Sequence, residues 1–103
     1  NMEVLSIIIG YLLGAIPFAL VIGKLFYKTD IRKYGSGNLG GTNAGRVLGK
    51  KAGVAVMVCD ILKVVLAVYI ASHFKNKELC SLLAGLFAAL GHCYPVFAHF
   101  KGG

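Results

Sequence analysis

The sequence is poor in charged residues, and acidic residues are the scarcest of them. Only 15% of its 103 residues are charged, and Asp and Glu together number four. A soluble domain carries about 25% charged residues, so an ordinary soluble fold is excluded. The three cysteines form no C-x-x-C pair. Cys, His and Asp also lack the spacing of a metal site, and we expect neither a metal nor another cofactor.

Hydrophobic residues, in contrast, are abundant and stand in long blocks. They make up 57% of the chain, and the mean hydropathy is +0.75. A helix of about 20 apolar residues crosses the roughly 30 Å hydrocarbon core of a bilayer. Three segments fit this length: residues 4–23, 52–74 and 79–100. The sequence therefore predicts an all-α, polytopic integral membrane protein, with residues 1–103 in a single membrane domain.

Basic residues are concentrated between the first two predicted spans. Seven of the eleven Lys and Arg residues lie in the loop 24–51. Loops rich in Lys and Arg stay in the cytoplasm, so this loop and Lys101 should be cytoplasmic and the N-terminus outside. Beside a membrane helix such a loop indicates topology and attraction for anions rather than nucleic acid.

Two small patterns within the spans suggest how the helices pack. Gly10 and Gly14 have the small-xxx-small spacing that lets another helix approach closely. Asp60 and Lys63 are three residues apart on one helix face, where they can neutralise each other in the membrane.

The predicted cytoplasmic loop contains a glycine-rich segment, residues 35–46. Five of these twelve residues are glycine, so several backbone N–H groups can point at one spot. Its other polar groups suit a phosphate, because hydroxyls and amides donate and the guanidinium of an arginine binds in a fork. They are Ser36, Asn38, Thr42, Asn43 and Arg46. We interpret the segment as an anion site, against the alternative of a flexible solvated loop.

A second polar segment, residues 91–103, ends the sequence. Pro95 should kink or end the third span and free backbone carbonyls. His92 is a candidate general base or hydrogen-bond donor, and the alternative is a histidine that ties two helices together. Lys101, Gly102 and Gly103 have the composition of a second anion cradle.

Together the two segments resemble the bacterial acyl-phosphate-dependent glycerol-3-phosphate acyltransferases of the PlsY type. That family carries S-G-N-x-G-A-T-N-x-x-R in one loop and G-H-x-x-P-x-F-x-x-F-K-G-G-K-G in another. Residues 36–46 match the first motif, with Gly41 in place of the alanine, and residues 91–103 match the second as far as they go. Residues 11–18 also look like the family's first helix. Because family members have about seven spanning helices, the resemblance implies an N-terminal half that is inactive alone.

The resemblance also implies a reaction and its partners. The family transfers a fatty acyl group from acyl phosphate to the sn-1 hydroxyl of glycerol 3-phosphate, giving lysophosphatidate and phosphate for phospholipid biosynthesis. It implies catalytic roles for His92, Ser36 and Arg46 in a bacterial cytoplasmic (inner) membrane. Substrate contacts are expected from the glycine-rich segment and the chain end, namely Ser36, Gly37, Asn38, Gly40, Thr42, Asn43, Arg46, Lys101, Gly102 and Gly103. A soluble enzyme that makes acyl phosphate is a further expected partner.

Two other classes of function are compatible with the composition. Half of a transporter for an anionic phosphorylated solute would place polar residues near the middle of the membrane. A small structural membrane protein would leave both polar segments unexplained. The clustering of polar groups at one predicted face favours the enzyme.

Overall fold

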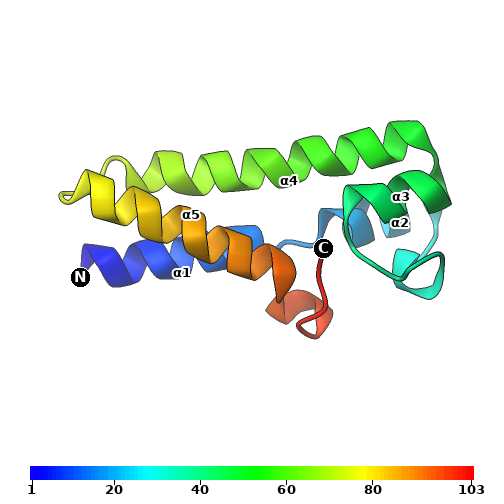
Figure 1. Ribbon diagram of the computed structural model, residues 1–103, viewed down its shortest axis with the longest axis horizontal. Coiled ribbons are helices and arrows are strands. Elements are labelled where there is room, and N and C mark those ends of the chain that lie inside the picture. Colours follow the sequence, from blue (N-terminus) through cyan, green and yellow to red (C-terminus); the bar gives the residue numbers. More distant parts are fainter.

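The computed structural model describes all 103 residues, and its regular structure is entirely helical (Figure 1). The all-α prediction is therefore confirmed. The helices, in order, are α1 (Met2–Gly14), α2 (Phe18–Tyr27), η1 (Ile31–Lys33), α3 (Gly41–Leu48), α4 (Lys50–Ala71), α5 (Lys77–Cys93) and η2 (Val96–Ala98).

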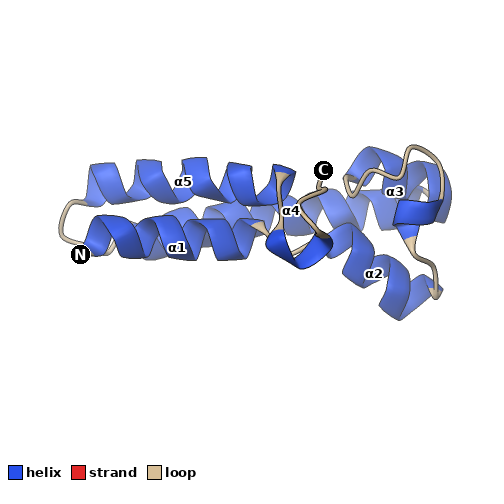
Figure 2. Ribbon diagram, turned by 90° about the horizontal axis from the view of Figure 1, so that it is seen from below, coloured by secondary structure: helices blue, strands red, loops and turns tan.

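Three segments are long and apolar enough to cross a membrane. They are Met2–Tyr27, Lys50–Ala71 and Lys77–Ala98, with mean hydropathies of 2.4, 2.4 and 1.6. In Figures 1 and 2, α1, α4 and α5 run side by side along the long axis of a molecule 43 Å in length. The N-terminus and the α4–α5 turn lie at one end, whereas α2 and α3 lie toward the other.

The first of these segments is broken rather than continuous. Pro17 lacks an N–H and its ring clashes with the preceding turn, so α1 ends at Gly14 and α2 begins at Phe18. Figure 2 shows α2 leaving the line of α1 at this break. The carbonyl of Ile16 leaves the helical ladder there and accepts hydrogen bonds from the Phe18 N–H and from Lys63.

Small residues bring α1 and α5 into close contact along their length. A Cβ atom on Gly10 would overlap the backbone of Ala84, and one on Gly14 would overlap that of Ala88. The close approach predicted from the Gly10–Gly14 spacing is therefore confirmed, and α5 is the partner. Backbones this close gain van der Waals contact that the lipid-like surroundings cannot supply.

The basic loop of residues 24–51 folds onto the end of α4. It contains α3, whose Gly45 meets Gly53 of α4 so closely that a Cβ on Gly53 would lie 2.7 Å from the Gly45 Cα atom. Beneath the loop lies a small apolar core that includes the fully buried Ile31 and Val56. This core fixes the glycine-rich segment on the helices.

The outer faces of the long helices remain apolar and uncovered. Only 22–33% of the residues in the three candidate spans are buried, and Leu62 and Leu86 are both more than half exposed. Apolar surface on this scale marks contact with lipid or with further helices.

Candidate functional site

The side chain of Asn43 organises the glycine-rich segment. Its Oδ1 accepts from the Ser36 N–H at 3.0 Å, and its Nδ2 donates to the carbonyls of Tyr34 (3.2 Å) and Asn38 (3.1 Å). The residue is only 2% exposed. One buried side-chain amide thus binds three backbone groups of the loop. It can do so because its oxygen accepts hydrogen bonds and its nitrogen donates them.

The start of α3 is prepared by a local turn. Asn38 Oδ1 accepts from the Gly40 N–H at 2.7 Å, and the Ser36 Oγ accepts from the Asn38 N–H at 3.3 Å. Asn and Ser favour such turns because their short side chains reach the backbone two residues on. Thr42 and Arg46 are one helical turn apart on α3, and both side chains are exposed.

The second polar segment turns back on the end of α5. After Pro95 the chain reverses, and the N–H groups of Gly102 and Gly103 donate to the carbonyls of Cys93 and His92, each at 3.1 Å. These bonds satisfy carbonyls that the end of a helix leaves free. In this arrangement the two glycine N–H groups are directed at α5.

Tyr11 of α1 secures the same turn from the opposite side. Its hydroxyl donates to the Tyr94 carbonyl at 2.8 Å and accepts from the Val96 N–H at 3.1 Å. The bend around Pro95 is therefore held to α1 as well as to its own helix.

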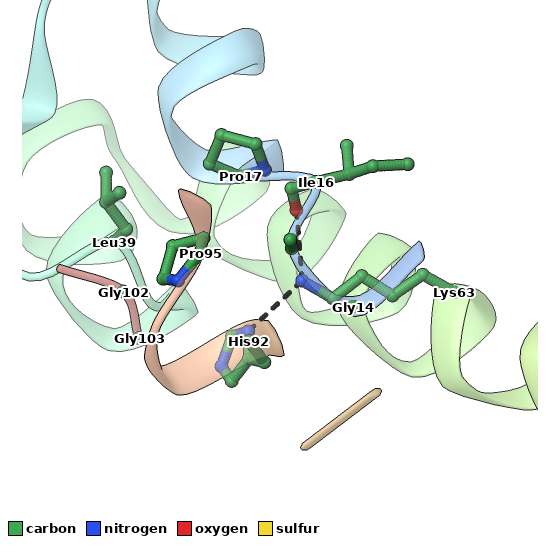
Figure 3. A pocket seen from close by; sticks show the side chains of 10 residues that line it. Gly14, Ile16, Pro17, Leu39, Lys63, His92, Pro95, Gly102 and Gly103 are labelled. Carbon is green, nitrogen blue, oxygen red and sulfur yellow. Dashed lines mark hydrogen bonds between the residues drawn. The ribbon is translucent and has the colours of Figure 1, made fainter. Parts of the chain in front are cut away.

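The two polar segments meet at Gly40 and Gly103. A Cβ on Gly103 would lie 3.3 Å from the Gly40 Cα atom and 2.6 Å from both Nε2 and Cε1 of His92. Figure 3 shows the Gly103 side of this junction, where His92, Lys63, Pro95 and the break between α1 and α2 surround one narrow crevice. Gly40 and Gly103, which are 63 positions apart in the sequence, thus belong to one site.

A wider cleft of about 550 Å³ opens beside this junction. It is lined by Arg32, Ser36, Gly37, Ala98, His99 and Lys101. Lys101 from the chain end and Ser36 from the glycine-rich segment therefore face one space. A cationic amine and a hydroxyl in one cleft can both donate to an anion.

Arg32 lines the cleft but is itself paired. Its Nε and Nη2 donate to the Asp30 carboxylate at 2.9 and 2.8 Å. These hydrogen bonds hold the pKa of Asp30 well below its usual range and raise the pKa of Arg32. Arg32 thus brings to the cleft a cation whose charge is largely balanced.

An apolar recess of about 400 Å³ lies between α4 and α5 on the other side of His92. Ile61, Val64, Val65 and Ala89 form its walls, together with Asp60, Cys93 and the His92 ring. His92 therefore stands between a polar junction and an apolar recess that opens from the helix pair.

Most of the residues predicted for the site lie around these features. Ser36, Gly37 and Lys101 line the wide cleft, and Gly40, His92, Gly102 and Gly103 form the junction. Asn38 and Asn43 are engaged within the loop, whereas Thr42 and Arg46 lie on the exposed side of α3.

Sequence reasoning missed three residues at the site. Arg32 carried no signal beyond its place in a basic loop. Tyr11 belonged to the family-like first helix but had no assigned contact. Lys63 was interpreted only as the partner of Asp60, which it is at 3.0 Å, and not as a neighbour of His92.

The chain is similar to known proteins over its whole length. A family model described as glycerol-3-phosphate acyltransferase matches residues 4–103. A glycerol-3-phosphate acyltransferase of Bacillus cytotoxicus is 58% identical over 99 residues, covering 96% of this chain and 50% of its own. One from Geobacillus kaustophilus is 54% identical over 102 residues, covering 99% of this chain and 51% of its own.

Two solved structures have the same fold. They are the glycerol 3-phosphate and lysophosphatidic acid forms of PlsY (YgiH), an integral membrane glycerol 3-phosphate acyltransferase. The first matches with a TM-score of 0.87 and 45% identity, covering 100% of this chain and 52% of its own. The second matches with a TM-score of 0.85 and 44% identity, covering 100% of this chain and 50% of its own. The chain thus spans about half the length of the relatives it matches.

Proposed function

The chain belongs to the glycerol-3-phosphate acyltransferase family, and we propose from this that it forms the N-terminal half of a membrane acyltransferase. The enzyme transfers a fatty acyl group from acyl phosphate to the sn-1 hydroxyl of glycerol 3-phosphate. Its products are lysophosphatidate and inorganic phosphate, which places it in phospholipid biosynthesis. Residues 1–103 without the remaining half are expected to be inactive.

The observation that carries this proposal is the meeting of the two glycine-rich segments where α1 and α5 end, beside the middle of α4. Gly40 lies against Gly103, and Ser36 faces Lys101 across one cleft. Both proposed substrates carry a phosphate, and the cleft supplies a cation and donors for such a group. The apolar recess beside His92 suits an acyl chain, which requires lipid-like walls.

The polar side chains of the candidate site have proposed roles that follow from their chemistry. Ser36, Thr42, Arg46 and Lys101 hold phosphate through hydroxyl, guanidinium or ammonium groups. Asn43, whose amide is engaged by three backbone groups, shapes the loop that presents them. His92 acts on the reacting oxygens from the junction.

The proposed reaction depends on placement rather than on a covalent enzyme intermediate. The glycerol 3-phosphate hydroxyl oxygen bonds to the acyl carbon, and the bond from that carbon to the phosphate oxygen breaks. Phosphate leaves with the electron pair, and the hydroxyl proton ends on the released phosphate. Acyl phosphate is already activated, so orientation and charge stabilisation are sufficient sources of rate.

The charge pattern supports a location and an orientation for the enzyme. We place it in the bacterial cytoplasmic (inner) membrane, with the N-terminus outside and the segments 24–51 and 91–103 at the cytoplasmic face. A water-soluble enzyme that makes acyl phosphate would deliver the donor at that face, and it remains an expected partner.

The alternative of half a transporter receives less support from the contacts of Asp60 and Lys63. Asp60 and Lys63 were the only charged residues expected near the middle of the membrane, because the other charged residues were expected outside the spans. Its Lys63 ammonium lies 3.1 Å from His92 Nδ1, so the pair adjoins the junction instead of forming a separate central site.

The proposal is tested with the purified full-length protein and two acyl donors. We expect lysophosphatidate from acyl phosphate and glycerol 3-phosphate, little or none from acyl-CoA, and no loss of activity with a chelator. A CoA ester brings a nucleotide tail for which the chain offers no surface. Efficient transfer from acyl-CoA, or complete loss with chelator, would contradict the proposal.

A further inference from the structure

Lys63 is a buried cation with three polar partners. Its side chain is 4% exposed. Its Nζ lies 3.0 Å from the Ile16 carbonyl, 3.0 Å from Asp60 Oδ1 and 3.1 Å from His92 Nδ1. Figure 3 shows the bonds to Ile16 and His92 converging on this one nitrogen. Lys63 thus makes two hydrogen bonds, to α5 and to the α1–α2 break, and one ion pair within α4.

This arrangement determines which nitrogen of His92 carries a proton. A lysine ammonium donates three hydrogen bonds and accepts none. The Asp60 carboxylate lies 3.0 Å from Lys63 Nζ and balances the charge of the ammonium group. His92 Nδ1 must then accept, and a proton on it would point at another donor. The neutral ring consequently carries its proton on Nε2.

The Nε2 edge of His92 faces the junction of the two polar segments. A Cβ on Gly103 would lie 2.6 Å from Nε2, so a side chain at that position would cover this edge. Only glycine fits this close against the ring. The proton on Nε2 is thus directed at the place where Gly40 and Gly103 meet.

We infer that Lys63, held by Asp60, is a positioning residue that fixes His92 as the Nε2–H tautomer. His92 then serves as a hydrogen-bond donor to an anionic substrate oxygen and not as a proton acceptor. The donor role rests on the proposed function, since acyl transfer supplies such an oxygen, whereas the tautomer rests on the contacts of Lys63 alone.

The first test is the 15N spectrum of the full-length protein labelled at histidine, with His92 assigned by substitution. We expect a protonated Nε2 and an unprotonated Nδ1. The Lys63→Met variant should show a mixture of tautomers. Lys77→Met, at the far end of α5, should leave the spectrum unchanged. A proton on Nδ1 in the unmodified protein, or an unchanged His92 spectrum in Lys63→Met, would overturn the inference.

Because Lys63→Met leaves Asp60 without its partner, the double variant Asp60→Asn with Lys63→Met is measured beside it. The double variant changes no net charge and removes the same hydrogen bond to His92. It should show the same mixture of tautomers. Retention of the Nε2–H form alone in a folded double variant would also overturn the inference.

The second test separates a donor from a base by activity. Losing a donor to a developing anion lowers kcat by about 10²–10³-fold, which we expect for His92→Ala. His92→Gln, which keeps an N–H near the Nε2 position, should recover part of this loss. Lys63→Met should lower kcat in the unmodified background but cause no further loss in His92→Ala, because the two act through one group. Equal losses in both backgrounds, or no recovery by His92→Gln, would contradict the inference.

The two tests also keep this inference apart from the proposed function. Absence of acyl transfer by the unmodified protein contradicts the proposed function, while the tautomer is decided by the spectrum alone. A wrong tautomer in an active acyltransferase contradicts only the inference.

Discussion

At the scale of single residues, Asn43 is the main support of the glycine-rich segment, because its amide holds three backbone groups. We predict that Asn43→Ala lowers the free energy of unfolding of the full-length protein by about 1–3 kcal/mol, since each buried group left unpaired is costly. Thermal unfolding in detergent measures this. The control is Asn76→Ala, which changes an exposed asparagine at the α4–α5 turn. Equal unfolding midpoints for the two variants would contradict the bracing role.

Arg46 tests whether α3 presents a guanidinium to a phosphate. We predict that Arg46→Lys lowers kcat/KM for acyl transfer by roughly ten- to a hundredfold, because a hydrogen bond to a charged group is worth about 1.5–3 kcal/mol and Lys lacks the planar fork. Lys50→Arg, another exchange of exposed basic residues nearby, should retain activity. Near-normal turnover of Arg46→Lys would remove Arg46 from the site.

The sequence indicates candidate polar residues for the site but not their contacts. Ser36, Arg46, His92 and Lys101 stand out because polar side chains are few in this chain. The bond between Lys63 and His92 depends on where α4 and α5 cross, and 29 positions separate the two residues. No local pattern reports such a crossing, so a helical neighbour was the only partner that spacing suggested for Lys63.

At the scale of helices, Gly14 of α1 and Gly85 of α5 offer a matched pair of tests. A Cβ on Gly14 would overlap the backbone of Ala88, whereas one on Gly85 would meet only Val68 Cγ2 at 3.4 Å. We predict that Gly14→Ala destabilises the full-length protein by about 1–3 kcal/mol through overpacking. Gly85→Ala should be neutral or stabilising, because alanine favours a helix.

Thermal unfolding of both variants in the same detergent checks this prediction. A lower midpoint is expected for Gly14→Ala alone. If Gly14→Ala unfolds at the same temperature as the unmodified protein, α1 and α5 do not approach as closely as the structure has them.

Helix positions were predictable to the extent that hydrophobicity alone determines them. The three apolar segments and the close approach at Gly10 and Gly14 follow from composition and spacing. The break at Pro17 was not expected, because an uninterrupted apolar run masks it and membrane helices often tolerate proline. Helix α3 was also not expected, since its glycines have low helix propensity and tertiary contact with α4 overrides it.

At the scale of the whole molecule, the orientation in the membrane is open to a direct measurement. We predict that the loop 24–51 faces the cytoplasm and the α4–α5 turn faces outward, because basic residues crowd the loop. Single cysteines are introduced as Lys50→Cys or Asn76→Cys after the three natural cysteines are replaced. An impermeant thiol reagent should label position 76 in intact cells, and position 50 only after permeabilisation. The reverse pattern would contradict the orientation.

The sequence was sufficient to predict an all-helical membrane protein. It was also sufficient to predict that the two polar segments lie on the same side of the membrane. Two crossings separate the loop from Lys101, which is enough to place both at one membrane face. The contact between Gly40 and Gly103 could not be predicted from the order of the spans. It depends on the turn at Pro95, which Tyr11 stabilises by hydrogen bonds.

The pairing of α1 with α5 has a consequence for biosynthesis. The glycine face of α1 is complete early, but its partner Ala88 is translated about 70 residues later, a delay of roughly 4–15 s at the usual rate of about 5–20 residues per second. During that interval Gly10 and Gly14 have only lipid or the insertion machinery beside them. Lys63 likewise leaves the ribosome before His92 does, with Asp60 as its nearest neutralising group. The order of synthesis therefore makes α5 the element whose arrival completes the packing of the glycine face of α1.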